Sequence, residues 1–351
     1  MNFASDNTAA VAPEIMQALV TGNEGFALGY GNDDLTRAVE RRIGEIFERE
    51  AAVFLVPTGT AANALALAHV SPPWGAVFAH EEAHILNDEC GAPEFFGGGL
   101  KLVGIPGAGC KLAPDALSET VSHYVGHSPH QVVPAAISFA QASESGTIYR
   151  PDEITALSKI AHAHGMKVHM DGARFANALV RTNASPAEVT WKAGVDVLSF
   201  GATKGGAMAA EAVVFFDRAD AKAMAERRKR AGHLLSKHRF LSLQFDAYLR
   251  DDCWLHLARH GNAMADRLAA GLAAAGRPPV WPVEANLVFI AIPKPLEARL
   301  NAAGARYYVW ESGSLPAGRG LGSDQVLIRL VSSFATREAE IDQFISIVKQ
   351  G

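Results

Sequence analysis

The chain has 351 residues, of which 49% are hydrophobic and 20% charged, so it can bury a large core and disorder is excluded as its main state. At roughly 150 residues per domain, this length predicts about two domains. The net charge of -5 argues against a dedicated nucleic-acid-binding protein, which would usually carry a basic excess.

Short apolar runs alternate with helical patterns from about residue 33 to residue 217. The first helix is expected over Asp33–Glu50, where apolar residues recur at helical spacing. A β-prone run, Ala52–Val56, and a helix, Ala61–Val70, follow it. Further strands are expected over Ala76–Ala79, Leu102–Ile105, Ala135–Ala140, Lys167–Met170, Val195–Phe200 and Ala212–Phe216, with intervening helices over Pro114–Tyr124 and Pro151–His164. Apolar strands separated by helices predict an α/β domain with a mostly parallel sheet.

Beyond about residue 240 the pattern changes. A long helix is expected over Cys253–Ala275, then strands over Asn286–Ile292, Tyr307–Trp310 and Val326–Val331, and a closing helix over Thr336–Lys349. Fewer elements favour a smaller α+β domain. We therefore expect a large domain over residues 1–245 and a small C-terminal domain over residues 246–351.

The cysteines and the N-terminus bear on the location of the protein. Cys90, Cys110 and Cys253 are widely spaced and form neither a disulfide framework nor a metal-binding CxxC pair. The N-terminus lacks the basic and apolar regions of a signal peptide, and no apolar run approaches the ~18 residues of a membrane helix. We expect a cytoplasmic protein with neither a membrane nor a nucleic acid as its partner.

The segment Thr58-Gly59-Thr60 follows an expected strand and opens an expected helix. Backbone N–H groups at a helix N-terminus, with two hydroxyls beside them, can bind an anion such as a phosphate group. The alternative is that a threonine simply caps the helix after a glycine turn. The segment is neither a GxGxxG fingerprint nor a P-loop.

Two further candidates lie at the carboxyl ends of expected strands, where open α/β sheets bind ligands. Asp171 precedes Gly172 and Arg174, which suits a site that needs one anion and one cation, although a lone aspartate there could also cap the next helix. Lys204 lies between Gly201 and Gly205. Most lysines lie at the surface, but an amine in a glycine-flanked apolar turn can lose its proton and form a Schiff base.

A phosphate cradle, then an aspartate, then a lysine is the order found in pyridoxal-phosphate enzymes of the aspartate-aminotransferase fold (fold type I). The chemistry explains the set. The cradle holds the cofactor phosphate, the aspartate keeps the pyridine nitrogen protonated so that the ring accepts electrons, and the lysine forms a Schiff base with the cofactor.

Over nearly its whole length, the chain resembles the family of low-specificity L-threonine aldolases and L-phenylserine aldolases. The segments that carry the resemblance are Phe3–Asn7, Phe54–Asn63, Asn87–Phe96, His169–Gly172, Ser199–Lys204 and Arg329–Phe334. The resemblance implies an aldehyde-lyase with a pyridoxal-phosphate-binding large domain of the aspartate-aminotransferase type. The reaction would be retro-aldol cleavage of threonine, allo-threonine or phenylserine to glycine and an aldehyde, through an external aldimine and a glycine quinonoid.

The resemblance also assigns roles to matching positions. Lys204 would carry pyridoxal 5'-phosphate covalently, Asp171 would pair with the ring nitrogen, and His84 would stack on the ring. The phosphate would be bound by Thr58, Gly59 and Thr60, and the substrate carboxylate by Ser5, Arg329 and Arg174, which also lies near the cofactor. The base for the β-hydroxyl proton would be His84, a water or His130, with His123 and His127 competing for the position of His130. No metal ion is implied.

A homotetramer built as a dimer of dimers, with active sites at subunit interfaces, is a further implication of the resemblance. The first ~15 residues would form an arm near the active site. Tyr30 would close the site of a neighbouring subunit, unless it is only a turn aromatic. The basic run Arg227–Arg230 is most simply a solvated helix face, although Arg228 or Lys229 could approach the cofactor phosphate of a neighbour.

Three other interpretations compete. His80-Glu81-Glu82-Ala83-His84 matches the HExxH signature of zinc peptidases, but an apolar strand directly precedes it and no third histidine motif follows. A β-eliminating lyase or aminotransferase of the same fold would share the cradle, Asp171 and Lys204. A cofactor-binding protein without catalysis is disfavoured by the presence of the lysine, both arginines and several histidines.

Overall fold

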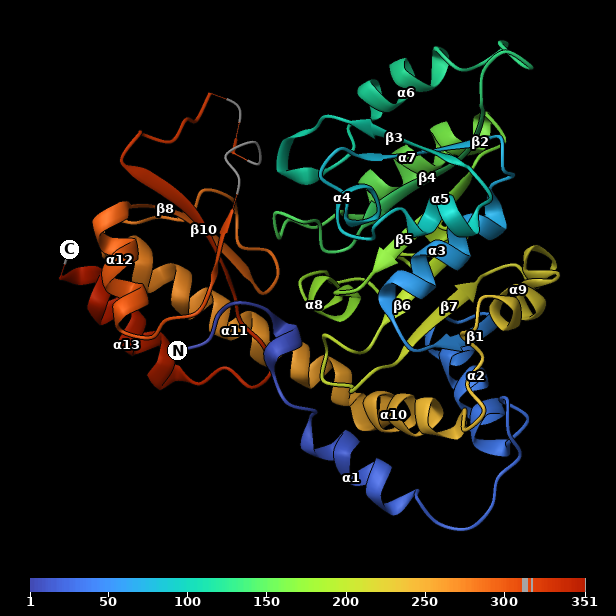
Figure 1. Ribbon diagram of the computed structural model, residues 1–351, viewed down its shortest axis with the longest axis horizontal. Helices are drawn as coiled ribbons and strands as arrows, with labels where there is room; N and C mark the ends of the chain where they lie inside the picture. The colour runs from blue at the N-terminus through green and yellow to red at the C-terminus, as the bar shows by residue number, and fades with distance from the viewer. Residues whose placement is uncertain (311–314, 317, 351) are drawn as a thin grey trace.

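A seven-stranded sheet and a three-stranded sheet organise the chain, in a computed structural model that describes residues 1–310, 315–316 and 318–350. The larger sheet and its helices form one unit, and the smaller sheet forms a second unit with the C-terminal helices (Figure 1). The N-terminal segment runs between the two units: Asn2 pairs with Arg306, and Phe3 is buried in the core of the smaller unit.

The larger sheet has the strand order β1-β7-β6-β5-β4-β2-β3. Its strands are β1 (Ala52–Val56), β2 (Gly75–His80), β3 (Lys101–Ile105), β4 (Val133–Ala140), β5 (Lys167–Gly172), β6 (Val197–Gly201) and β7 (Glu211–Phe215). The five strands from β6 to β3 pair in parallel, whereas β7 runs antiparallel to both β6 and β1. The predicted mostly parallel sheet is thus confirmed.

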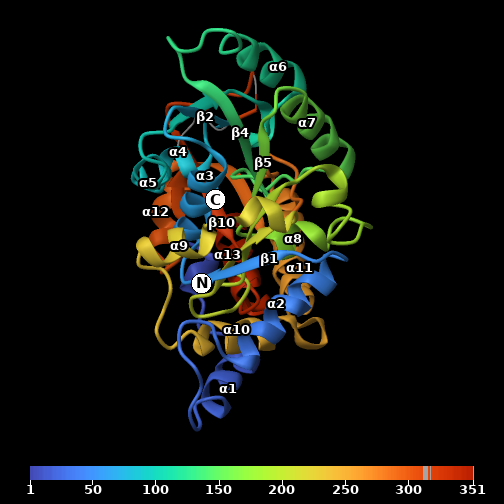
Figure 2. The same cartoon turned by 90° about the vertical axis from the view of Figure 1, so that its right-hand side faces the viewer.

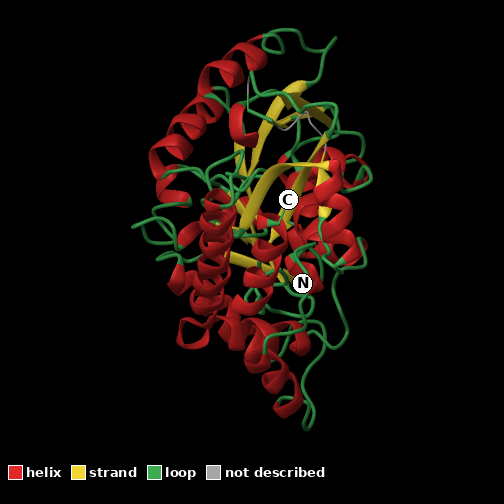
Figure 3. Ribbon diagram, turned by 90° about the vertical axis from the view of Figure 1, so that its left-hand side faces the viewer, coloured by secondary structure: helices red, strands yellow, loops and turns green. Residues whose placement is uncertain are grey.

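Helices cover both faces of this sheet (Figures 2 and 3). Figure 2 shows α3 and α7 on opposite sides of β4 and β5. The helices of this unit are α1 (Pro13–Thr21), α2 (Asp34–Ile46), α3 (Gly59–Val70), α4 (His84–Asn87), α5 (Ala92–Phe96), α6 (Pro114–Ser122), α7 (Pro151–Ala163), α8 (Phe175–Leu179), α9 (Met224–Arg230) and α10 (Arg239–Leu249). Helix α3 consists mainly of small and aliphatic residues and is buried on nearly every side, which lets its N-terminus sit close to the strand ends.

The smaller sheet has the order β8-β10-β9 and is antiparallel throughout. Its strands are β8 (Leu287–Pro293), β9 (Tyr308–Trp310) and β10 (Gln325–Val331), and its helices are α11 (Cys253–Ala274), α12 (Lys294–Ala302) and α13 (Glu338–Lys349). Among the described residues, no helix is long and apolar enough to cross a membrane.

Helix α11 connects the two hydrophobic cores. Its first turns place Trp254 and Ala258 in the core of the larger unit, and its later turns place Met264 and Leu268 in the core of the smaller one. The boundary expected between residues 245 and 246 lies inside α10, whose buried side chains belong to the larger core. We propose that the structural division falls within α11 instead.

Candidate active site

A cavity of about 370 Å³ lies at the carboxyl ends of the parallel strands, where the two units meet. Its walls come from the N-terminal segment, the start of α3, the ends of β4 and β5, the loop after β6, and strands β9 and β10. The predicted site residues at the cavity are Ser5, Gly59, Thr60, His84, Asp171, Arg174, Lys204 and Arg329. Segments distant in the sequence therefore converge here, as expected for an open α/β sheet.

The N-terminus of α3 opens onto the cavity. Thr58 has an extended backbone, and its hydroxyl oxygen accepts a hydrogen bond from the backbone N–H of Ala61 at 3.1 Å, so it caps the helix. Gly59 and Thr60 face the cavity, whereas Thr58 is not among its described lining residues. Apart from its chain neighbours and the backbone of its own helix, no described atom lies within 4 Å of the position that a Cβ on Gly59 would take. The helix terminus thus offers open space and backbone donors to an anion.

Four side chains form a continuous polar chain along one wall. The buried amide of Asn63 donates from Nδ2 to Asp171 Oδ2 and to Glu89 Oε1, each at 2.8 Å. Glu89 Oε1 also lies 3.0 Å from His84 Nδ1. The hydrogen bond that Glu89 accepts from His84 raises the pKa of His84, while burial raises the pKa of Glu89. The arrangement couples the ring-nitrogen candidate Asp171 to the stacking candidate His84.

Asp171 remains an anion despite its burial. Burial by itself would raise the pKa of its carboxyl, but the charges of Lys204 and His84 and a hydrogen bond from the backbone N–H of Ala173 hold it below its usual range. The pKa of the Lys204 amine is lowered, first by burial and then by the charge of Arg174. A carboxylate that stays charged and an amine that loses its proton easily are the two groups that Schiff-base chemistry on a pyridine ring needs.

Two arginines at the cavity differ in their hydrogen-bond partners. Arg174 binds the buried carboxylate of Asp6 with two hydrogen bonds, in which its Nε and Nη2 donate at 2.7 and 2.9 Å. Burial by itself would raise the pKa of Asp6, but the charges of Arg174 and Lys204 hold it below its usual range. Arg329 stacks on Trp310, with its guanidinium carbon 4.3 Å from the ring centroid. Its buried Nε has no hydrogen-bond partner among the described residues, and burial lowers its pKa to about 10. Arg329 is therefore poised to bind an added anion.

Two predicted residues lie away from this cavity. His130 lies in an exposed turn ahead of Val133, where β4 begins, whereas the cavity is at the other end of β4, near Ala140. Within this subunit His130 therefore lies outside the cavity, and its role as a base stays a prediction. Tyr30 is 47% exposed, with the Lys229 amine 4.4 Å from its ring centroid.

The local structure decides between the interpretations of two sequence patterns, the HExxH match and the basic run Arg227–Arg230. His80 ends strand β2, and its Nε2 lies 2.9 Å from the carbonyl of Gly107, whereas His84 begins α4. The two histidines do not share a helix face, so the zinc-peptidase geometry does not form. The solvated-face interpretation of Arg227–Arg230 is wrong for Arg228, which is buried and donates from Nη1 to the carbonyl of Leu55 at 3.1 Å.

Sequence reasoning did not assign a role to several residues of the site. Asn63 and Glu89 lie inside segments that carry the family resemblance, so their membership there was an available indication. Asp6 also lies in such a segment, beside Ser5, whose hydroxyl accepts the N–H of Asn7 at 3.2 Å. Glu144 lies outside those segments, and only the folded chain brings it to the cavity.

Comparisons with known proteins agree with this geometry. The model of the beta-eliminating lyase family matches residues 2–294. The chain is 42% identical over 310 residues to a low specificity L-threonine aldolase of Pseudomonas aeruginosa, covering 88% of this chain and 89% of that protein. It is 38% identical over 348 residues to a low specificity L-threonine aldolase of a Pseudomonas species, with coverage of 99% and 96%. A structure of Leishmania major threonine aldolase matches with a TM-score of 0.92 at 30% identity, covering 99% of this chain and 98% of that one. These matches confirm the predicted fold class.

Proposed function

Because the chain belongs to the beta-eliminating lyase family, we propose that it is a pyridoxal-phosphate-dependent aldehyde-lyase that cleaves L-β-hydroxy-α-amino acids to glycine and an aldehyde. The identities of 42% and 38% to low specificity L-threonine aldolases, each over most of both chains, carry this proposal. They also confirm the resemblance that the sequence motifs indicated. Threonine, allo-threonine and phenylserine are the proposed substrates.

The residues around the cavity fit pyridoxal phosphate. The open α3 terminus at Gly59 and Thr60 would hold the phosphate, and Asp171 would pair with the ring nitrogen. Lys204 would bind the cofactor covalently, and His84 would stack on its ring. When bound, the cofactor supplies an electron sink for the pair released as the Cα–Cβ bond breaks.

The protein's own residues orient the substrate and handle its protons. Arg329 binds the substrate carboxylate through its unpaired guanidinium edge, because a planar fork grips two oxygens at once. Arg174, held by Asp6, and Ser5 complete this end of the site. Burial lowers the pKa of the Lys204 amine, so it gives up its proton more readily than an exposed lysine and is placed to exchange a proton near Cα. Removal of the β-hydroxyl proton requires a separate base in the cavity.

We also propose that the chain forms a homotetramer, a dimer of dimers in which Tyr30 closes a neighbour's site. Support comes from apolar side chains that the subunit leaves exposed near Tyr30, among them Val20, Phe26 and Leu28. A cytoplasmic location is proposed as well, since Cys90, Cys110 and Cys253 are all free thiols.

A substrate panel tests the proposed function. The purified holoenzyme should release glycine and the matching aldehyde from L-threonine, L-allo-threonine and L-phenylserine, but not from D-threonine. The variant Lys204→Ala should lose this activity and the yellow absorbance of the bound cofactor. Formation of 2-oxobutanoate from threonine, without glycine, would instead establish the alternative β-eliminating lyase, and a 2-oxo acid from amino-group transfer would establish an aminotransferase.

A further inference from the structure

The loop between β4 and α7 brings a carboxyl group to the cavity for which the assignments above give no role. Glu144 lines the same cavity as His84, Asp171 and Lys204. The residue as a whole is half-buried and is one of those that line the cavity. A carboxyl in a ligand cavity beside other titratable groups is a candidate for proton transfer.

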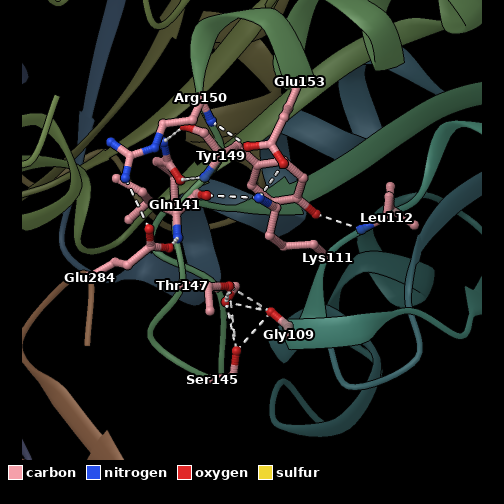
Figure 4. A network of polar contacts seen from close by, with 12 residues as sticks. Gly109, Lys111, Leu112, Gln141, Ser145, Thr147, Tyr149, Arg150, Glu153 and Glu284 are labelled. Carbon is pink, nitrogen blue, oxygen red and sulfur yellow. Dashed lines mark hydrogen bonds and ion pairs between the residues drawn. The ribbon is translucent and has the colours of Figure 1, made fainter. Parts of the chain in front are cut away.

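Hydroxyl groups on either side of Glu144 fix the loop in place. Ser143, Ser145 and Thr147 all donate to the single carbonyl of Gly109, at 2.9, 2.7 and 2.7 Å. Figure 4 shows Ser145 and Thr147 converging on this carbonyl from the loop. Because these bonds come from residues immediately before and after Glu144, they restrict the backbone from which its side chain extends.

The two ends of the loop are held independently. Gln141 and Tyr149 exchange two hydrogen bonds of 2.9 Å: the amide of Gln141 donates to the Tyr149 carbonyl, and the Tyr149 N–H donates to the Gln141 side-chain oxygen (Figure 4). On either side of Tyr149, the backbone N–H of Ile148 and the guanidinium of Arg150 both donate to the carboxylate of Glu284, at 3.0 and 2.9 Å. A rigid loop of this kind holds a side chain at a defined position, as acid–base catalysis requires.

The carboxyl of Glu144 is aimed at the His84 end of the cavity. Its Oε1 accepts the backbone N–H of His84 at 3.1 Å, which orients the group beside the residue predicted to stack on the cofactor ring. Burial raises the pKa of Glu144 to about 7, which suits a group that takes up and releases a proton near neutral pH. Glu89 is hydrogen-bonded to Nδ1 of His84, and His84 already has the predicted role of stacking on the cofactor ring, whereas Glu144 has no other assigned role.

We propose that Glu144 is the base that removes the β-hydroxyl proton of the substrate. This inference rests on the proposed aldolase function. The O–H bond would break with its proton moving to the Glu144 carboxylate, as the carbonyl of the aldehyde forms and the Cα–Cβ bond breaks; the bound cofactor would supply the electron sink for the released pair. That pair would return to Cα together with a proton from the Lys204 amine, which completes glycine, while Glu144 passes its proton to solvent and Lys204 regains one from it.

The variant Glu144→Gln keeps the shape of the side chain and removes the basic group. The turnover number of the holoenzyme for L-threonine should fall by about 10²–10⁴-fold, the usual contribution of a positioned acid–base group. Equilibrium binding of glycine, followed by the cofactor absorbance, should be unchanged, because glycine has no hydroxyl. Glu119→Gln makes the same charge change on the exposed side of α6 and serves as the matched control, with wild-type turnover expected.

Each outcome of this experiment decides the inference. Unchanged turnover in Glu144→Gln overturns it, and so does a parallel loss of turnover and glycine affinity, which would place the carboxyl at the cofactor or the substrate carboxylate. If Glu144→Gln does not fold, Glu144→Asp keeps the charge but withdraws it by one methylene, and full turnover in that variant overturns the inference as well. A wild-type enzyme that binds glycine but releases none from threonine would refute the proposed function itself.

Discussion

The amide of Asn63 is predicted to hold two buried carboxylates together, and the variant Asn63→Leu tests this. Leucine has the same branched shape and the same number of side-chain heavy atoms, so the substitution removes both donors without opening a cavity beside α3. In the wild-type protein, the Asn63 amide donates to Asp171 and Glu89 at 2.8 Å each. Without it, two carboxylates face each other across an apolar side chain.

The loss of unfolding free energy expected for Asn63→Leu follows from these two hydrogen bonds. A hydrogen bond to a charged group contributes about 1.5–3 kcal/mol, so two of them contribute about 3–6 kcal/mol. Part of this is offset, because Asn63 Oδ1 is buried without a partner among the described residues and leucine removes that unpaired oxygen. We expect the apoenzyme to lose about 3 kcal/mol of unfolding free energy near neutral pH.

The loss should depend on pH in a defined direction. Burial already raises the pKa of Glu89, and loss of the amide donor raises it further. A carboxyl with a raised folded-state pKa contributes stability that is fully present below its unfolded-state pKa and is lost as the pH rises through the folded-state value. The difference between wild type and Asn63→Leu should therefore be smaller at about pH 5 than at about pH 8.

Urea unfolding of the apoenzyme at both pH values is the assay. Asn177→Leu is the matched control, since the buried Asn177 pairs with the neutral amide of Asn262 at 3.0 Å and should show a smaller loss that does not change with pH. If Asn63→Leu loses no more stability than this control, or if its loss does not grow with pH, the bridging role of Asn63 is refuted.

Three further predictions concern the cavity. In Glu89→Gln the pKa of His84 should fall, which NMR titration of its imidazole measures. The stability that the His84–Glu89 pair adds at pH values below the raised pKa of His84 should also disappear, and an unchanged titration would contradict the pairing. Arg329→Lys keeps the charge but loses the planar fork, so KM for threonine should rise about 10- to 100-fold in steady-state assays, and an unchanged KM would show that the carboxylate binds elsewhere. The apoenzyme of Gly59→Ala should be as stable as wild type in thermal unfolding, because the new methyl group meets open space. Equilibrium titration should nevertheless show weaker binding of the cofactor, and an equal affinity would exclude a phosphate group at this helix terminus.

Local patterns predicted most of the strands. The β-prone run Ala52–Val56 has the same bounds in the structure, because both of its ends coincide with a change in residue type. The helix expected over Asp33–Glu50 ends earlier, at Ile46, because Glu48 adopts a φ of 55° and reverses the chain. Helix α10 was not predicted, since Arg239–Leu249 is buried on several sides and shows no clear apolar stripe.

Some residues of the site could be placed from their neighbours in the chain, whereas others depend on contacts between distant segments. Asp171 and Lys204 follow strands directly, so their position at the carboxyl edge could be inferred from the chain on either side of them. Asn63 and Asp171 are 108 positions apart in the chain and meet only when it folds, and no local pattern encodes that contact. His130 lies in a turn ahead of β4, at the end of that strand away from the cavity, so its predicted role would need a contact that the single subunit does not make.

Asp6 explains why the two arginines of the site are not equivalent. Its Oδ2 accepts from Arg174 of the larger unit at 2.7 Å and from Asn286, next to β8 of the smaller unit, at 3.1 Å. Phe3, three residues earlier, is anchored in the smaller core, where its ring lies 5.4 Å from Phe344. The N-terminal segment therefore ties Arg174 to the smaller unit that carries Arg329. Because Arg174 is already paired with a protein carboxylate, Arg329 is the arginine of this end of the cavity that remains to bind the substrate carboxylate.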